Sequence, residues 1–198
     1  VEIAKNWELS NKQNMDIIDM PVRLGKSAAI NRAIPEIGES EVFVMTDAEA
    51  ILEEGALRRI GRWMKDPAIG GVCGTINNET EDSAYRYWYN WFRTGESRAD
   101  STPIFEGSIA AYRAEALEPI DATANADDSQ LAVIVRNKGL RTISDQSIRF
   151  SETPLTNQKE LHHRTVRRGQ GLTRHFWRNK DRWFRNGWWG TIPGLNGL

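Results

Sequence analysis

The ten residues Val42–Ile51, VFVMTDAEAI, run from an apolar stretch directly into two carboxylates. The residues Val42–Met45 have the composition of a buried β-strand. Asp47 and Glu49 follow at the point where such a strand ends, separated by one alanine. Because ligands of α/β proteins bind beyond the carboxyl ends of the strands, these two side chains are candidates for a binding site.

The acidic pair allows two interpretations from the residues alone. Two hard oxygen ligands at this spacing can hold Mg²⁺ or Mn²⁺, which would in turn bind phosphate oxygens of a substrate. In the alternative, Asp47 caps a following helix and Glu49 lies in its first turn, where the positive end of the helix dipole favours an anion. An Asp-x-Glu sequence does not decide between them.

Helical and strand-like segments alternate on both sides of this stretch. The expected helices are 27–34, 52–67, 83–97, 127–139 and 158–179; the expected strands are 42–47, 69–76 and 140–152; and 105–117 is expected to be a strand followed by a helix. Such alternation predicts an α/β fold, with a mostly parallel sheet flanked by helices. The aromatic helix that contains Tyr85–Arg93 is expected to pack in the core and to line a binding groove.

Composition limits the class of protein. A chain of 198 residues with 39% hydrophobic and 27% charged residues suits one soluble globular domain. Its net charge of −1 argues against bulk binding of nucleic acid, so no nucleic-acid partner is expected. Cys73 is the only cysteine, which excludes a disulfide framework and a cysteine-based zinc site. No run of 18 apolar residues predicts a membrane span.

Six segments in a fixed order carry more information than the acidic pair alone. They are GKSAAIN (Gly25–Asn31), the Asp47-x-Glu49 pair, DPAIGGVCG (Asp66–Gly74), FEGSIAAYR (Phe105–Arg113), NADDSQLA (Asn125–Ala132) and RTVRRGQG (Arg164–Gly171). This succession resembles the family 2 glycosyltransferases of the GT-A fold. The resemblance extends over residues 24–172, about three quarters of the chain.

The resemblance implies an inverting transferase that moves a sugar from a UDP- or GDP-sugar to an acceptor hydroxyl with the help of Mg²⁺ or Mn²⁺. It implies that Asp47 contacts the metal and the donor ribose, and that Glu49 coordinates the metal. Asp128 would be the catalytic base, with Asp127 as its acidic neighbour. The remaining expected donor-binding residues are Lys26, Asn31, Arg164, Arg167 and Arg168.

The residues themselves leave alternatives for two of these segments. Adjacent carboxylates repel, so one of Asp127 and Asp128 should hold its proton more tightly and suit a general base. Helix N-capping would also explain this pair. Lys26 does not belong to a Walker phosphate loop, because Met20 stands where that pattern requires glycine. It either lines the donor site or is a solvated surface lysine.

The chain departs from the family pattern in two motifs. Glu49 stands where the family usually has Asp, and the segment Arg164-x-x-Arg167-Arg168 lacks the family's Gln and Trp, so processive polymer synthesis is not implied. The opening VEIAKNW is similar to the helix that follows the family's first strand. We therefore expect residues 1–172 to form an N-terminally incomplete catalytic domain, followed by a basic aromatic tail at 173–198.

The tail interleaves tryptophans with arginines, as in HFWRNKDRWFRNGWW (175–189). This pattern suits a membrane interface, single-stranded nucleic acid, or a helix that packs back on the domain. Because family relatives use lipid-linked acceptors, we expect a lipid-linked or glycan acceptor and a location in the cytoplasm, at the cytoplasmic face of a membrane.

Two other functions are compatible with parts of the sequence. Without its first strand the domain could be a non-catalytic binding or scaffolding remnant. A phosphatase of the haloacid-dehalogenase type also ends a strand with Asp-x-Asp and uses a lysine. There the lysine follows the acidic pair, whereas Lys26 precedes Asp47.

Overall fold

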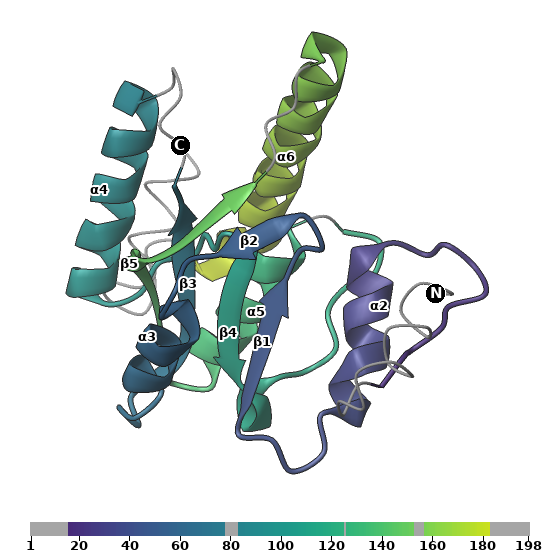
Figure 1. Ribbon diagram of the computed structural model, residues 1–198, viewed down its shortest axis with the longest axis vertical. Helices are drawn as coiled ribbons and strands as arrows, with labels where there is room; N and C mark the ends of the chain where they lie inside the picture. Colours follow the sequence, from purple (N-terminus) through teal and green to yellow (C-terminus); the bar gives the residue numbers. More distant parts are fainter. Residues whose placement is uncertain (1–15, 78–82, 125, 153–156, 183–198) are drawn as a thin grey trace.

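The structure is a computed structural model, which describes residues 16–77, 83–124, 126–152 and 157–182. The elements in chain order are α2 (Lys26–Ala33), η1 (Ile34–Glu36), β1 (Val42–Thr46), β2 (Ala50–Leu52), α3 (Ala56–Trp63), β3 (Ile69–Ile76), α4 (Ser83–Ala99), β4 (Ile109–Arg113), η2 (Ala114–Ala116), α5 (Asp127–Asn137), β5 (Arg141–Glu152), α6 (Gln158–Arg178) and η3 (Lys180–Arg182). One sheet forms the centre, and helices surround it (Figure 1). The α/β fold predicted from the alternation of elements is confirmed.

The five strands have the order β1-β4-β3-β5-β2. Only β3 and β5 pair in parallel, while β1 with β4, β3 with β4, and β2 with β5 are antiparallel. The expectation of a mostly parallel sheet is therefore wrong for the described strands. Alternation shows that a helix separates two strands, but it does not show that the helix carries the chain back across the sheet.

The reversal of β4 follows from the path of the chain after α4. Residues 100–108 return to the carboxyl ends of β1 and β3, so β4 starts where those strands finish. Its first residue, Ile109, pairs with Thr46 at the end of β1, and Ala110 pairs with Cys73 of β3. The segment that precedes β4 is thereby placed beside the acidic pair that follows β1.

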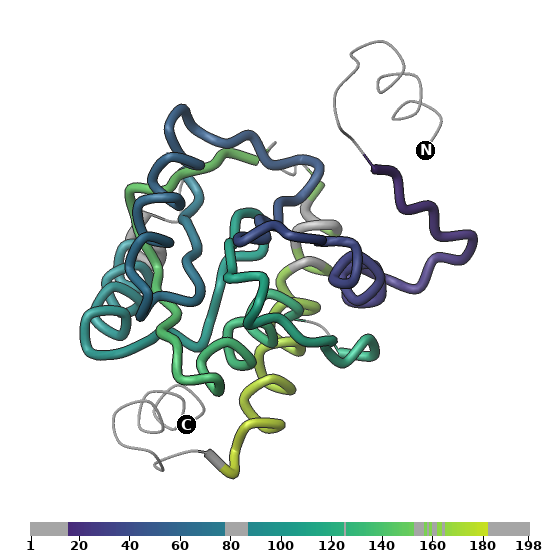
Figure 2. The backbone as a smooth tube through the Cα atoms, turned by 90° about the horizontal axis from the view of Figure 1, so that it is seen from below, coloured from purple at the N-terminus to yellow at the C-terminus, as the bar shows by residue number. Residues whose placement is uncertain are grey.

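Each face of the sheet carries its own core. On one face, α2 and α5 supply Ile30 and Leu131, which pack with Tyr112 of β4. On the other face, α3 packs through Ile60 against residues that include Phe150 of β5. Figure 2 shows α3 and α4 on one side of the molecule and α2 on the opposite side.

The last helix extends past the sheet. Figure 1 shows the first half of α6 projecting beyond the carboxyl ends of the strands, while its second half reaches the domain. His175 and Phe176 in that second half are buried. The expected boundary at residue 172 falls inside this continuous helix. Residues 1–15 and 183–198, which hold the expected first helix and most of the expected tail, lie outside the described residues.

Two further expectations concern membrane-spanning helices and the burial of α4. No helix in the described part of the chain is long and apolar enough to cross a membrane. The aromatic helix α4 does not bury most of its rings, because Tyr87, Trp88, Trp91 and Phe92 are exposed. The expectation that this helix is mainly core is wrong, since its buried face is formed by Arg93 and Ser97.

Candidate active site

Lys26 lies at the centre of a polar cluster at the carboxyl edge of β1. It is the first residue of α2, and its Nζ donates to Asp47 Oδ1 at 2.5 Å and to the Gly107 carbonyl at 3.4 Å. Its Nζ also lies 3.5 Å from Asp127 Oδ2. Partial burial opposes the charged form of Lys26, but the charges of Asp127 and Asp47 outweigh burial and raise its pKa. Three sequence-predicted residues are thus brought together by one ammonium group.

A second carboxylate reaches Asp47 through a serine. The buried Ser108 Oγ donates to Asp47 Oδ2 at 3.1 Å and also contacts Glu152 Oε1. Glu152 is the last residue of β5 and pairs with Ala50 of β2. Because β5 runs parallel to β3, the ends of these two strands lie at the same edge of the sheet. A hydroxyl has one proton, so Ser108 cannot donate to both carboxylates at once.

The Asp127-Asp128 pair opens α5. The preceding residue, Ala126, has a left-handed backbone (φ 64°), and the helix has no side-chain N-cap. Asp128 Oδ1 accepts from the Ser129 backbone N–H at 2.8 Å, whereas the buried Asp127 Oδ2 has no hydrogen-bond partner. Simple N-capping therefore does not explain the pair, because both acids lie in the first turn of α5. Asp127 Oδ2 faces the Lys26 ammonium.

Asp128 is the acid of this pair whose pKa is raised. Burial and the neighbouring charge of Asp127 raise the pKa of Asp128 to about 7, against the hydrogen bond from Ser129, which lowers it. The raised pKa of Asp128 agrees with the prediction that one of the two acids holds its proton more tightly. Repulsion between the acids was the expected cause, but burial makes the larger contribution to the raised pKa of Asp128.

A buried arginine holds the segment that passes in front of Asp128. Arg93 of α4 is 2% exposed, and it donates to the Ile104 carbonyl at 2.9 Å and to Cys73 Sγ at 2.8 Å. Its other terminal nitrogen lies 3.3 Å from Glu106 Oε1. Since Glu106 precedes Gly107, this clamp fixes the backbone whose carbonyl meets Lys26.

Gly107 is in close contact with the cluster. A Cβ at this position would lie 3.0 Å from Asp128 Oδ2 and 3.4 Å from Lys26 Nζ. Any larger side chain would enter the space between the lysine and the proposed base. Glycine at this position therefore leaves room for an atom of a ligand beside both groups.

The other sequence-predicted residues occupy different positions. Glu49 is exposed in the turn between β1 and β2. Because β2 follows at Ala50 and α3 begins only at Ala56, the helix-start interpretation of Asp47 and Glu49 is wrong. The Asn31 side chain donates to the Ile120 carbonyl and accepts from the Ile120 N–H, both at 2.7 Å, so both of its polar groups hold the segment before α5.

The arginines of α6 are not part of the Lys26 cluster. Arg167 and Arg168 are exposed on the projecting half of the helix. The side chain of Arg164 lies outside the described residues. The resemblance implied that all three arginines bind the donor; Arg167 and Arg168 are exposed to solvent.

Sequence reasoning missed Glu152 and Arg93 as parts of this region. Glu152 is the last residue of β5, and its position at a strand end was a usable signal. Arg93 gave none, because its role depends on contacts with distant residues, such as Cys73, 20 positions away.

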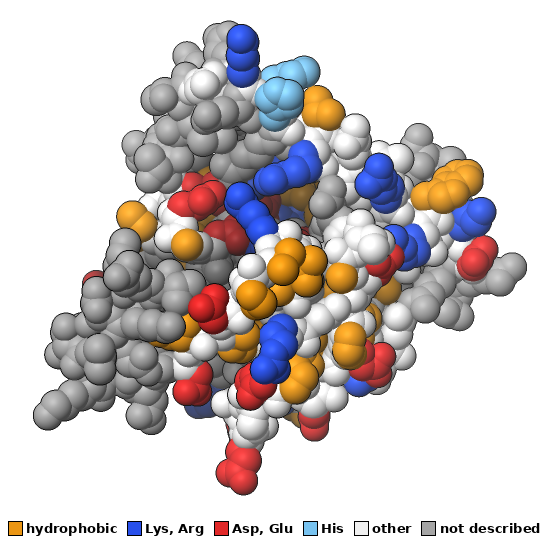
Figure 3. Space-filling view, turned by 90° about the vertical axis from the view of Figure 1, so that its right-hand side faces the viewer, with side chains coloured by type: hydrophobic (Ala, Val, Ile, Leu, Met, Phe, Trp, Pro, Cys, Tyr) orange, Lys and Arg blue, Asp and Glu red, His pale blue; other side chains and the backbone are white. Residues whose placement is uncertain are grey.

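The acidic groups suit a hard divalent cation in their chemistry. Within the described ranges, no group of three His, Cys, Asp or Glu side chains is arranged to hold a metal. The oxygen donors of Asp47 and Glu49 nevertheless match the ligands that Mg²⁺ and Mn²⁺ prefer. Figure 3 shows acidic side chains in a hollow of the molecule, with Lys and Arg side chains beside them.

Comparison with known proteins agrees with this geometry. The sequence matches the family model described as glycosyl transferase family 2 over residues 1–121. Among solved structures, the mannosyltransferase PcManGT from Pyrobaculum calidifontis, in complex with GDP-Man and Mn²⁺, matches with a TM-score of 0.86 and 26% identity. That match covers 99% of this chain and 55% of PcManGT, so the chain spans about half the length of that protein. No curated protein matches the chain.

The two comparisons reach different parts of the site. The family match includes Lys26, Asp47 and Ser108 but ends before Asp127 and Asp128. The structural match extends over nearly the whole chain and includes both acids. It also confirms the predicted GT-A-like fold.

Proposed function

The chain belongs to glycosyl transferase family 2, and we propose that it moves a sugar from a nucleoside diphosphate sugar to an acceptor hydroxyl, with Mn²⁺ or Mg²⁺ as cofactor. GDP-mannose is the first donor to test, because PcManGT was solved with GDP-Man and Mn²⁺. A UDP-sugar is the alternative donor. The acceptor we propose is lipid-linked or a glycan, at the cytoplasmic face of a membrane.

One observation carries the proposal: Lys26, Asp47 and Asp127 come from separate segments and meet at one edge of the sheet. A leaving diphosphate develops negative charge, and preorganised cations stabilise it. Lys26 supplies such a cation at a position that its two carboxylate partners hold. Asp47 and Glu49 would bind the divalent ion, which, when bound, supplies further positive charge to the diphosphate.

Asp128 is the base in this proposal. The acceptor oxygen forms a bond to the anomeric carbon of the donor, and the bond from that carbon to the diphosphate oxygen breaks. The proton of the attacking hydroxyl moves to Asp128, whose pKa of about 7 suits proton transfer near neutral pH. A single displacement of this kind inverts the configuration at the anomeric carbon.

Arg93 and Glu106 support the base without contacting the reacting atoms. Arg93 holds Ile104 and Glu106, and the charge of Glu106 contributes to the raised pKa of Asp128. We assign Arg93 as a positioning residue for the segment that includes Gly107.

Calorimetric titration of GDP and UDP, each with and without Mn²⁺, tests the proposal. We expect one nucleotide to bind only in the presence of Mn²⁺, and Asp47→Asn to weaken that binding at least about tenfold. Asp145→Asn, which removes a carboxylate that contacts Trp63 on another flank, is the matched control and should bind normally. Absence of binding for both nucleotides would favour the scaffolding alternative.

A further inference from the structure

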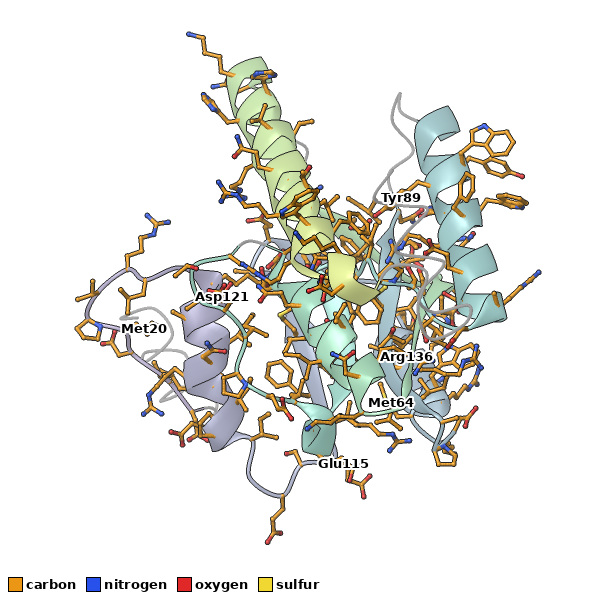
Figure 4. All side chains as sticks on the ribbon, turned by 180° about the vertical axis from the view of Figure 1, so that it is seen from behind. Met20, Met64, Tyr89, Glu115, Asp121 and Arg136 are labelled. Carbon is orange, nitrogen blue, oxygen red and sulfur yellow. The ribbon has the colours of Figure 1, made fainter. Side chains whose placement is uncertain are left out.

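Four aromatic side chains of α4 form an exposed surface, which we call the α4 aromatic face. Tyr87, Trp88, Trp91 and Phe92 are 66%, 58%, 56% and 59% exposed. Their spacing of three and four residues places them on one side of the helix. Figure 4 shows aromatic side chains that point outward from α4, away from the sheet. Soluble surfaces rarely expose contiguous aromatic residues without a binding role.

Within the described ranges, the packing of the domain does not use this face. The opposite side of α4 packs on the domain, where Arg93 and Ser97 are buried and Ser97 Oγ accepts from the Ser144 N–H at 2.9 Å. The exposed rings contact one another edge to face, with centroids 5.5 to 6.0 Å apart. Such splayed rings present edges and faces outward rather than closing on each other.

Cationic side chains lie on the same flank. Trp63 at the end of α3 donates to Asp145 Oδ2 at 2.6 Å, and the neighbouring Gln146 donates to the Asn90 carbonyl of α4 at 3.1 Å. The end of α3 is thereby tied to the middle of α4, and Figures 1 and 2 show both helices on this flank. The exposed cations of this flank are Arg58 and Arg62 of α3, Lys65 just after α3, and Arg98 of α4.

From this combination we infer that the flank formed by α3 and α4 docks on an anionic lipid bilayer. The α4 aromatic face enters the headgroup region, and the cations contact lipid phosphates. Tryptophan and tyrosine favour this region, and peripheral binding grows with buried apolar area and with attraction to anionic lipid. The inference specifies the membrane contact of the proposed function and does not depend on sugar transfer.

A second copy of the chain fits this flank less well. A two-fold symmetric interface brings the same patch of both copies together. The α4 aromatic face would then bring the cations of both copies close to one another, and like charges repel. An anionic surface complements these cations instead.

Sedimentation with vesicles tests the inference. The probes are vesicles of phosphatidylcholine alone and of phosphatidylcholine with about one third phosphatidylglycerol, at low and high salt. We expect binding to the anionic vesicles that weakens with salt. The double variant Trp88→Ser/Trp91→Ser should bind at least about fivefold more weakly. Trp177→Ser removes an equally exposed tryptophan, 66% exposed on α6, and should bind as the unchanged protein does.

Three results would overturn the inference. The first is no binding of the unchanged protein to anionic vesicles, and the second is equal binding by the double variant and by Trp177→Ser. The third is an unchanged protein that is a dimer and that the double variant converts to a monomer. The unfolding midpoint of the double variant shows whether it is folded. If it is not, Trp88→Tyr/Trp91→Tyr, which keeps amphipathic rings, should retain binding where serine removes it. Mn²⁺-dependent nucleotide binding by the double variant should be unchanged, so failure of docking and failure of the proposed chemistry are distinguishable.

Discussion

The cluster around Lys26 takes its polar groups from several segments, whereas the projecting half of α6 presents its cations from one helix. In the cluster, Lys26 contacts Asp47, Asp127 and the Gly107 carbonyl, and burial raises the pKa of Asp128. On α6, Arg167 and Arg168 are exposed. Charges that are held between segments and partly removed from water are strongly coupled, while exposed charges are screened. This difference is the reason why we propose the cluster, and not α6, as the site of the chemistry.

Among substitutions in these two regions, Lys26→Met is expected to weaken donor binding the most. The substitution removes the cation between Asp47 and Asp127, so donor binding should weaken at least about tenfold and transfer should fall about a hundredfold or more. Stability should change by less than about 1 kcal/mol, because these groups are partly exposed. Titration of GDP with Mn²⁺ and a transfer assay measure the two effects.

Lys138→Met is the control for that substitution. Lys138 pairs with Glu118 at 2.9 Å on the surface and lies in neither region. It should leave binding and transfer unchanged. Normal nucleotide binding by Lys26→Met would place the donor somewhere other than this cluster.

Arg93→Met should cost about 2 to 4 kcal/mol of unfolding free energy, because Glu106 and the Ile104 carbonyl lose a buried partner. Denaturant unfolding measures the loss. Arg98→Met, on the exposed side of the same helix, should cost less than about 0.5 kcal/mol. Equal small costs for both arginines would show that the Arg93 clamp does not hold the segment.

The pH dependence of transfer reports the state of Asp128. Its pKa is raised to about 7, so below that pH the side chain carries a proton and cannot accept one. The rate should therefore rise with pH through about 7 and then level off. Asp127→Asn removes a charge that raises this pKa, so the inflection should move to lower pH in a pH–rate profile. An inflection that does not move would contradict the coupling between the two acids.

The smallest effect is expected from Arg167→Ala/Arg168→Ala. Both side chains are exposed on α6, so donor affinity should change by less than about twofold. The same GDP titration measures it. A tenfold loss would restore the role at the donor diphosphate that the resemblance implied, and would remove the contrast between the two regions.

Features that depend on neighbouring residues were predictable from the sequence, and features that depend on distant segments were not. The strand Val42–Thr46 and the start of α5 at Asp127 were predictable, because hydrophobic periodicity and local acidic residues define them. The direction of β4 and the burial of Arg93 were not, because both depend on how distant segments pack. From the sequence, an arginine in an aromatic helix is expected at the surface. Only its contacts with Cys73 and Ile104 show that Arg93 is buried.

The role of Asp128 as the base is tested most directly by comparing Asp128→Asn with the unchanged protein in two assays on the same samples. The first measures Mn²⁺-dependent GDP binding, and the second measures transfer from radiolabelled GDP-mannose. If UDP is the nucleotide that binds, UDP and the corresponding UDP-sugar replace them. Asparagine keeps the size of the side chain and cannot accept the proton. The account predicts donor binding within about twofold of normal and a loss of transfer of about a hundredfold to ten-thousandfold. Normal transfer by Asp128→Asn would contradict it.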